Sequence, residues 1–354
     1  MSVIIDGFVI SDESKTFIVA ELSANHGHDF DIALQTIKAA SEVGADAIKL
    51  QTYTADTLTL DCESAHFKIK HGTIWDGETL HSLYKKAYTP WEWHKDLFSY
   101  AQSLGLICFS SPFDFSAVDF LEKLNVPAYK IASPEITDIP LIEYVAKKQM
   151  PIIISTGMAT LMDIDLAVNT CRAVGNEKII LLKCTSAYPT PLHEVDLRTI
   201  PNLKDTFGCE VGLSDHTLGN VVAGAAVALG ARVVEKHFIL DKTLGGPDAS
   251  FSLDPDEFKN LVNTIRDTEL ALGKINYRLS EKMLKVREFC RSLFISTDVK
   301  KGDTVTINNV RSVRPGHGMH PKYLSRVIGS RFSDDFSKGT PLSFSKLERF
   351  DVDY

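Results

Sequence analysis

The chain has 354 residues, of which 44% are apolar, and its 46 acidic against 38 basic residues give a formal net charge of −8. The longest apolar runs fall well short of the roughly 20 residues that cross a bilayer, and the first residues lack the basic and apolar regions of a signal peptide. An acidic balance without basic runs argues against a nucleic acid as partner, although a locally basic pocket can still attract a small anion.

Strand-like and helix-like segments alternate along the first 273 residues. The strand-like segments are short apolar runs, and each is followed by a stretch with helical periodicity, such as 30–44 or 254–273. The second strand is followed first by a long irregular insertion, 54–90, and only then by a helix over 91–105. The predicted strands are 16–23, 47–53, 106–112, 128–133, 151–157, 178–186, 209–216 and 232–239.

This alternation predicts an α/β fold with eight strand–helix units, which is a (β/α)₈ TIM barrel. An open doubly wound sheet is the rival, but no GxGxxG follows the first strand, so its dinucleotide-binding form lacks support. After Gly273 the pattern changes, and short strands alternate with turn signals such as KKGD and RPGHG. We therefore predict a barrel domain over 1–273, a linker over 274–290, and a small β-rich domain over 291–354.

Histidines stand near the ends of the last two predicted strands, His216 in GLSDH and His237 in VVEKH. In a TIM barrel the active site lies at the C-terminal ends of the strands, and neighbouring strands are about 4.8 Å apart. A lone histidine there is more often a satisfied core group, whereas a pair that closes adjacent strands suits a divalent transition metal with open positions. The pair is therefore a candidate metal site, with no HExxH motif or cysteine cluster beside it.

Lysines inside apolar strands are a second signal. Lys49 and Lys130 stand in DAIKLQTY and YKIAS with few carboxylates nearby in the sequence, and a buried lysine is costly unless it is paired. At least one of them is therefore expected to meet an anionic ligand. Serines at the ends of other strands would complete a cradle for phosphate or carboxylate. Lys183 and Lys236 stand in similar runs, but either could face the helix layer instead.

Motifs along nearly the whole chain are specific when taken together: AELSANHG, DAIKLQTY, CFSSPFD, YKIASPEI, IISTGMAT, CTSAYPTP, GLSDHTLG, VEKHF and VRPGHGMHP. In these motifs the chain closely resembles the sialic acid synthase family. Enzymes of this family condense phosphoenolpyruvate with an amino-sugar aldehyde to make a nine-carbon ulosonic acid. The resemblance implies a TIM barrel followed by an antifreeze-like (SAF) domain.

Two loops are similar to the pseudaminate branch of that family: GTIWDGETLHSLYKKAYTPWEWH after the second strand and GGPDASFSLDPDEF after the eighth. The sugar substrate of this branch is 2,4-diacetamido-2,4,6-trideoxy-L-altrose, which is less polar at C6. Trp75 and Phe251 are aromatic candidates for contact with that part of the sugar, and a place in the core is an equal alternative for both.

The resemblance also implies roles for individual residues. His216 and His237 would hold a divalent metal, Mn²⁺ or Mg²⁺ with Co²⁺ as a further option, and Glu21 and Glu235 would be the catalytic groups near the reacting carbons. The residues implied to bind phosphoenolpyruvate are Lys49, Ser111, Lys130, Ser133, Ser155, Ser186 and Ser214. The residues implied to bind the sugar are Gln51, Trp75, Tyr188, Asp248 and Arg314.

Two positions depart from the family pattern. Ser186 stands where the N-acetylneuraminate branch has Asn, and NHGHDFD replaces the usual NHNG, which leaves the role of His28 open. The resemblance further implies a homodimer in which the C-terminal domain, with Arg314, covers the partner's barrel. Six scattered cysteines without a CxxC pair indicate reduced thiols and a cytoplasmic protein.

Three alternatives stay open. An N-acetylneuraminate or legionaminate synthase would run the same chemistry on another sugar. A Schiff-base aldolase would use Lys130 or Lys183 as its nucleophile and would need no metal. A sugar- or ice-binding module would use the antifreeze-like tail, but it would leave the polar strand ends of the barrel unexplained.

Overall fold

Eight parallel strands form a barrel in the computed structural model, which describes residues 2–70 and 75–348. The strands are β3 (Phe17–Glu21), β4 (Ala47–Thr52), β5 (Ile107–Pro112), β6 (Tyr129–Ile131), β7 (Ile152–Ser155), β8 (Ile179–Cys184), β9 (Glu210–Asp215) and β10 (Val233–His237). Each strand pairs with its neighbour in the sequence, and β10 pairs with β3 to close the barrel. The predicted TIM barrel is therefore confirmed. Residue 71, residues 72–74 of the first loop motif and residues 349–354 of the predicted C-terminal domain lie outside the described residues.

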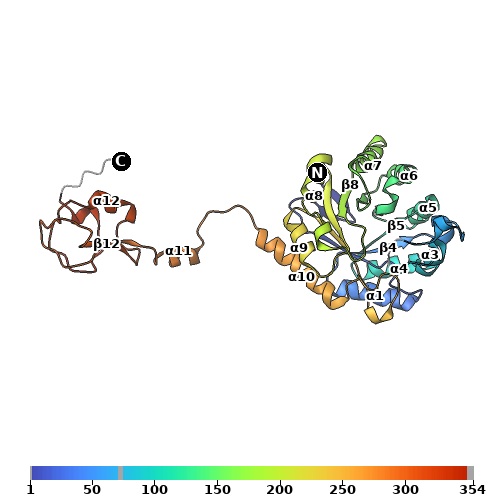
Figure 1. Ribbon diagram of the computed structural model, residues 1–354, viewed down its shortest axis with the longest axis horizontal. Coiled ribbons are helices and arrows are strands. Elements are labelled where there is room, and N and C mark those ends of the chain that lie inside the picture. Colours follow the sequence, from blue (N-terminus) through green and yellow to red (C-terminus); the bar gives the residue numbers. More distant parts are fainter. Residues whose placement is uncertain (1, 71–74, 349–354) are drawn as a thin grey trace. The chain divides into compact units, whose positions relative to one another are not determined.

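Helices follow the strands and surround the barrel (Figure 1). They are α1 (Phe30–Glu42), α4 (His94–Ser103), α5 (Phe115–Lys123), α6 (Ile139–Lys147), α7 (Leu161–Ala173), α8 (Thr199–Phe207), α9 (Val221–Ala228) and α10 (Pro255–Leu272). Several begin at an aspartate, such as Asp29 or Asp254, whose carboxylate accepts hydrogen bonds from the first turn. Their apolar faces pack against the outward side chains of the strands, for example Ile48 and Leu181, and make the larger core.

Inward side chains change character along each strand, because alternate residues point into the barrel. The lower inward positions, such as Phe17 and Val19, form an apolar cluster with a hairpin of β1 (Val3–Ile5) and β2 (Phe8–Ile10), which the sequence analysis did not predict. The next inward position of β3 is Glu21, at the C-terminal end of the strand. The apolar cluster therefore fills the lower part of the barrel and leaves the polar positions at its C-terminal end.

The insertion between β4 and α4 contains two short helices, α2 (Ala55–Leu58) and α3 (Leu80–Ala87), where the sequence predicted only irregular structure. Helix α3 begins after Thr79, whose hydroxyl accepts a hydrogen bond from the backbone N–H of Ser82. A β-bridge joins Lys68 to Thr79, the residue before α3.

The chain divides into two units, Met1–Gly273 and Lys274–Tyr354. The second unit contains α11 (Glu281–Arg287), the antiparallel pair β11 (Ser292–Ile295) and β12 (Val310–Val313), and α12 (Leu324–Val327). It has a small apolar core of its own, which includes Leu293, Val305 and Phe332. Every helix in the described parts of the chain is too short or too polar to cross a lipid bilayer.

Candidate active site

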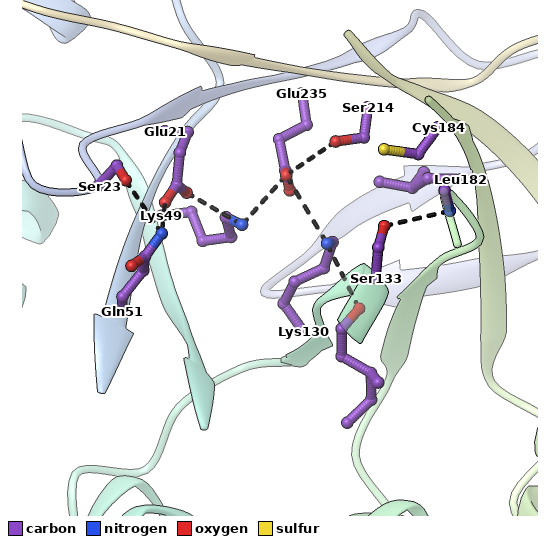
Figure 2. A network of polar contacts seen from close by, with 12 residues as sticks. Glu21, Ser23, Lys49, Gln51, Lys130, Ser133, Leu182, Cys184, Ser214 and Glu235 are labelled. Atoms are coloured by element: carbon purple, nitrogen blue, oxygen red, sulfur yellow. Dashed lines mark hydrogen bonds and ion pairs between the residues drawn. The ribbon is translucent and has the colours of Figure 1, made fainter. Parts of the chain in front are cut away.

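Two lysines and two glutamates form an ion-pair network at the C-terminal end of the barrel (Figure 2). Lys49 Nζ lies 3.0 Å from both Glu21 Oε2 and Glu235 Oε1, and Lys130 Nζ lies 3.7 Å from Glu235 Oε1. All four side chains are at most 6% exposed. The carboxylates come from the first and last strands, which barrel closure brings together, so burial of the lysines does not by itself require a ligand.

The two glutamates differ in environment. Burial raises the pKa of Glu21 to about 7, and Glu235 adds to the shift while Lys49 opposes it. Burial also opposes ionisation of Glu235, but Lys130 and Lys49 outweigh it and lower its pKa to about 2. Near neutral pH, Glu21 can therefore gain or lose a proton, whereas Glu235 stays a fixed anion.

Side-chain hydrogen bonds orient both carboxylates. Gln51 Nε2 donates to Glu21 Oε1 at 2.9 Å, and Ser214 Oγ donates to Glu235 Oε1 at 3.3 Å. Burial lowers the pKa of Lys130. Among the described residues, its ammonium donates to the carbonyl of Ile131 at 3.4 Å and faces Glu235. An anion beside Lys130 would favour its charged form.

Serine hydroxyls stand on the strands that flank β6. Ser111 near the end of β5 and Ser155 at the end of β7 are buried, and neither hydroxyl has a hydrogen-bond partner among the described residues. A buried hydroxyl without a partner costs free energy that a ligand oxygen would recover. Ser133 Oγ accepts a hydrogen bond from the backbone N–H of Gly157 at 3.1 Å.

Gly157 gives the serines room. A Cβ at this position would lie 2.4 Å from Ser186 Oγ, 2.8 Å from Cys184 Sγ and 2.9 Å from Ser133 Oγ. The backbone of the loop after β7 therefore lies directly against these polar groups. A side chain at position 157 would fill the space between them, so this glycine is needed for the open cradle.

The two histidines of the predicted metal site lie edge to face, His216 directly after β9 and His237 at the end of β10, with ring centroids 5.4 Å apart and ring planes 61° apart. His216 Nδ1 donates to the carbonyl of Thr185 at 3.1 Å, which leaves Nε2 for a cation. His237 Nδ1 is buried without a hydrogen-bond partner in the described structure, and Asp248 Oδ2 lies 3.7 Å away. Burial, with His216 beside it, holds the pKa of His237 well below its usual range, so this ring is neutral, as a metal ligand must be.

These residues fit a divalent cation, because each histidine keeps one nitrogen for it. No third His, Cys, Asp or Glu completes a three-residue cluster within residues 2–70 and 75–348. Oxygen atoms of water or substrate would therefore take the remaining coordination positions.

Aromatic rings hold the histidines in place. The ring of Tyr188 lies 4.3 Å from that of His216, and the ring of Phe251 lies 5.0 Å from those of Tyr188 and His237. Phe251 is only 1% exposed and does not line the pocket, so the expected contact between Phe251 and a sugar is wrong. Its core alternative is the observed one.

A pocket of about 480 Å³ opens beside the histidines and is lined by four of the predicted sugar-binding residues, Gln51, Trp75, Tyr188 and Asp248. Asp248 Oδ2 accepts a hydrogen bond from Ser23 Oγ at 2.5 Å. The fifth, Arg314, belongs to the second unit, where it follows β12.

One wall of the pocket comes from the insertion. Helix α3 turns Leu80, Leu83, Tyr84 and Ala87 towards it, and this spacing of three and four residues places them on one helix face. Phe113, in the loop after β5, adds another apolar side chain to the lining. The pocket is thus polar near His237 and largely apolar along helix α3, while His66 and Lys68 of the insertion add polar groups to its lining.

Sequence reasoning missed two polar groups of the site. Glu135 lines the pocket, burial raises its pKa to about 7, and its Oε2 has no hydrogen-bond partner among the described residues. Its position two residues after Ser133, just past a strand end, was the available signal. Cys184 received no role of its own among the six cysteines, but its thiol lies 3.8 Å from His216 Nδ1.

Comparison with known proteins agrees with the fold. Residues 36–277 match the NeuB family and residues 291–348 match the SAF domain. The chain is 48% identical over 333 residues to a pseudaminic acid synthase of Campylobacter jejuni, with 94% of this chain and 97% of the relative covered. It is 40% identical to an N,N'-diacetyllegionaminic acid synthase of Legionella pneumophila, with 94% of each chain covered.

A solved structure shows the same architecture. The N-acetylneuraminic acid synthetase of Leptospira borgpetersenii superposes with a TM-score of 0.72 at 29% identity, over 82% of this chain and 96% of that one. The family match covers most of the barrel, and the relatives align over nearly the whole chain. The chain therefore belongs to the NeuB family and carries a SAF domain in its C-terminal unit.

Proposed function

We propose that this chain has pseudaminic acid synthase activity, condensing phosphoenolpyruvate with 2,4-diacetamido-2,4,6-trideoxy-L-altrose and releasing phosphate. The observation that carries the proposal is the buried network of Lys49, Lys130, Glu21 and Glu235, beside serine hydroxyls that have no hydrogen-bond partner among the described residues. Gln51, which lines the pocket, connects this network to it by its hydrogen bond to Glu21. The likeness to pseudaminic acid synthases exceeds that to the legionaminic acid synthase, 48% against 40% identity.

Phosphoenolpyruvate would lie among the lysines and serines. Lys49 and Lys130 offset its negative charge, and Ser111 and Ser155 have hydroxyls free to donate to its oxygens. Ser133, Ser186 and Ser214 stand on neighbouring strand ends and complete the cradle. Because these groups are fixed before the ligand binds, little reorganisation is needed during the reaction.

The reaction forms one C–C bond and breaks one C–O bond. C3 of phosphoenolpyruvate attacks the aldehyde carbon of the sugar, whose oxygen takes up a proton, and water adds at C2. The bond between C2 and the phosphate oxygen then breaks and releases inorganic phosphate. Glu21 is suited to orient the water and accept its proton, because its pKa of about 7 lets it change protonation near neutral pH.

His216 and His237 would hold the divalent cation, with Mn²⁺ or Mg²⁺ the proposed metal. When bound, the cation supplies Lewis-acid polarisation of the aldehyde. Glu235 stays ionised and holds both lysines in place. Gln51, Tyr188 and Asp248 line the pocket next to these groups and would bind the polar part of the sugar.

The apolar wall favours the proposed sugar. The aldehyde carbon must lie near the lysines and histidines, so C4 to C6 would extend towards the insertion. In the diacetamido sugar this half carries an acetamido methyl at C4 and a methyl at C6. N-acetylmannosamine has hydroxyls at both positions, and these would gain less than methyl groups from contact with Leu80, Leu83 and Ala87.

Phosphate release is the test. Metal-stripped protein is mixed with phosphoenolpyruvate and either the diacetamido sugar or N-acetylmannosamine, with and without Mn²⁺. Metal-dependent release with the diacetamido sugar supports the proposal, and release with N-acetylmannosamine alone overturns the choice of sugar. Borohydride trapping of a sugar on Lys130, without metal, would replace the mechanism by a Schiff-base aldolase.

A homodimer in which the second unit covers the partner's barrel, with Arg314 near the sugar, remains part of the proposal. It rests on the family resemblance and the SAF match. A cytoplasmic location is proposed from the six free cysteines. Cross-linking of a cysteine pair placed at positions 314 and 75, and separation of linked dimers from linked monomers, tests the domain arrangement.

A further inference from the structure

We infer that the buried ion pair between Lys236 and Asp215 positions the two histidines for the cation. The inference deepens the proposed function, because the histidines are its proposed metal ligands. Neither residue belongs to the ion-pair network of Lys49, Lys130, Glu21 and Glu235, and neither has a role in the reaction described above.

Lys236 and Asp215 lie directly opposite each other in the register of β10 and β9. Lys236 Nζ is 2.6 Å from Asp215 Oδ2, and each side chain is 1% exposed. Their neighbours Glu235 and His237 contribute to the inward network and the pocket. Because side chains alternate along a strand, Lys236 and Asp215 face the surrounding helix layer.

The ion pair belongs to a closed ring of hydrogen bonds. Lys236 Nζ donates to the carbonyl of Thr217 at 2.5 Å, and Asp215 Oδ1 accepts from the N–H and the hydroxyl of Thr217 at 2.9 and 2.7 Å. The ring therefore joins both neighbours of His216 to the residue that precedes His237. Movement of either histidine backbone would break a bond of the ring.

The energetics favour a geometric role over a purely stabilising one. Burying two charges costs several kcal/mol per ion before the pair forms, and apolar residues of similar size often hold strands together as well. A directional ring fixes the strand ends relative to each other, which apolar packing does less strictly. A metal site needs its ligands held within about 0.5 Å, and loss of supporting partners typically weakens metal binding about 10–100-fold.

The test replaces both charges at once, since either single change would leave a buried charge unpaired. Lys236→Met with Asp215→Leu keeps the volume roughly constant and should fold. Calorimetric titration of the metal-stripped double variant with Mn²⁺ should show affinity about 10–100-fold weaker than that of the unaltered protein. The melting temperature should fall as well, because the buried Thr217 loses its partners, so a control must separate lost stability from lost metal affinity.

Two further variants keep the inference falsifiable. Thr217→Val removes one hydrogen bond of the ring at nearly constant volume, and we expect Mn²⁺ affinity about threefold weaker. Arg266→Met is the matched control, because it breaks the ion pair with Asp46, 2.8 Å apart, beside Ile18 and away from the histidines. It should lower the melting temperature and leave Mn²⁺ affinity unchanged.

Mn²⁺ affinity within twofold of the unaltered protein in the folded double variant would overturn the inference. Equal weakening in Arg266→Met would also overturn it, because the effect would then follow general stability. Failure of the unaltered protein to bind Mn²⁺ would overturn the metal site of the proposed function itself. If the unaltered protein binds Mn²⁺ normally and the variants bind it equally well, only the positioning role of the ion pair is refuted.

Discussion

Leu83→Asn should change which sugar the protein uses. Leu83 lies in the middle of the apolar face of helix α3 that lines the pocket, between Leu80 and Ala87. Its side chain is only partly buried, so the folded core does not depend on it. An amide at this position removes an apolar contact for the diacetamido sugar and offers a hydrogen-bond partner to a sugar hydroxyl.

The size of the effect follows from the contact that is lost. Leucine to asparagine costs about 0.5 kcal/mol in helix propensity, which leaves the fold intact. Loss of one apolar contact in a pocket changes discrimination by roughly 10–200-fold. We therefore expect kcat/KM for the diacetamido sugar, divided by that for N-acetylmannosamine, to fall at least about 10-fold. The KM for phosphoenolpyruvate should stay the same, because its cradle lies on the strands.

The assay is phosphate release at saturating phosphoenolpyruvate and Mn²⁺ with each sugar in turn. Leu60→Asn is the matched control, since Leu60 belongs to the same insertion but is 65% exposed and does not line the pocket. A ratio for Leu83→Asn within twofold of the unaltered protein would refute the role of the wall. Equal shifts in both variants would refute it too.

Further predictions concern the inner site. Because the folded pKa of Glu21 is about 7 against 4.5 when unperturbed, kcat/KM should rise with pH to a plateau above 7, and Glu21→Gln should remove this rise. Between these two pKa values the native state holds a proton on Glu21 that the unfolded state has lost, so the free energy of unfolding falls as pH rises through this window. In Glu21→Gln the melting temperature should not show this decrease with pH. Gly157→Ala places a methyl in the cradle and should raise the KM for phosphoenolpyruvate about 10-fold or more, with an unchanged circular dichroism spectrum. Lys130→Met should lower kcat/KM about 10²–10³-fold, whereas Lys183→Met, whose ammonium donates to a carbonyl outside the network, should change it little. Chelation should abolish phosphate release, and Mn²⁺ should restore it in the unaltered protein but not in His237→Ala.

The barrel could be predicted because its signals are local. Each strand is a short apolar run, and each run ends in polar residues that point to one rim. The hairpin of β1 and β2 was missed because two three-residue strands leave almost no pattern, and their pairing gains stability only from the barrel floor on which Ile5 and Ile10 pack. Helix α3 was missed because the loop around it has mixed composition and the helix is only eight residues long.

The charges of the site could not be assigned from the sequence, because pairing across the barrel is non-local. Lys49 is 186 residues from Glu235 along the chain, yet their side chains are 3.0 Å apart. Sequence reasoning could place each group at the rim, because alternate residues of a strand point into the barrel. It could not say which carboxylate would be ionised, since that depends on which lysines lie within reach.

Barrel closure therefore determines the protonation states as well as the shape of the site. Glu235 lies on β10 within reach of Lys49 and Lys130, so it stays an anion. Glu21 on β3 pairs with one of these two lysines, Lys49, so burial dominates and Glu21 holds a proton up to about pH 7. With Glu21 neutral, two cations and one anion leave the inner network with a net positive charge. That surplus attracts phosphoenolpyruvate, whereas proton transfer from water needs the ionised form of Glu21, which dominates above about pH 7. Glu21, which is proposed to accept the proton of the water, is thus also the group of this network whose charge changes near neutral pH.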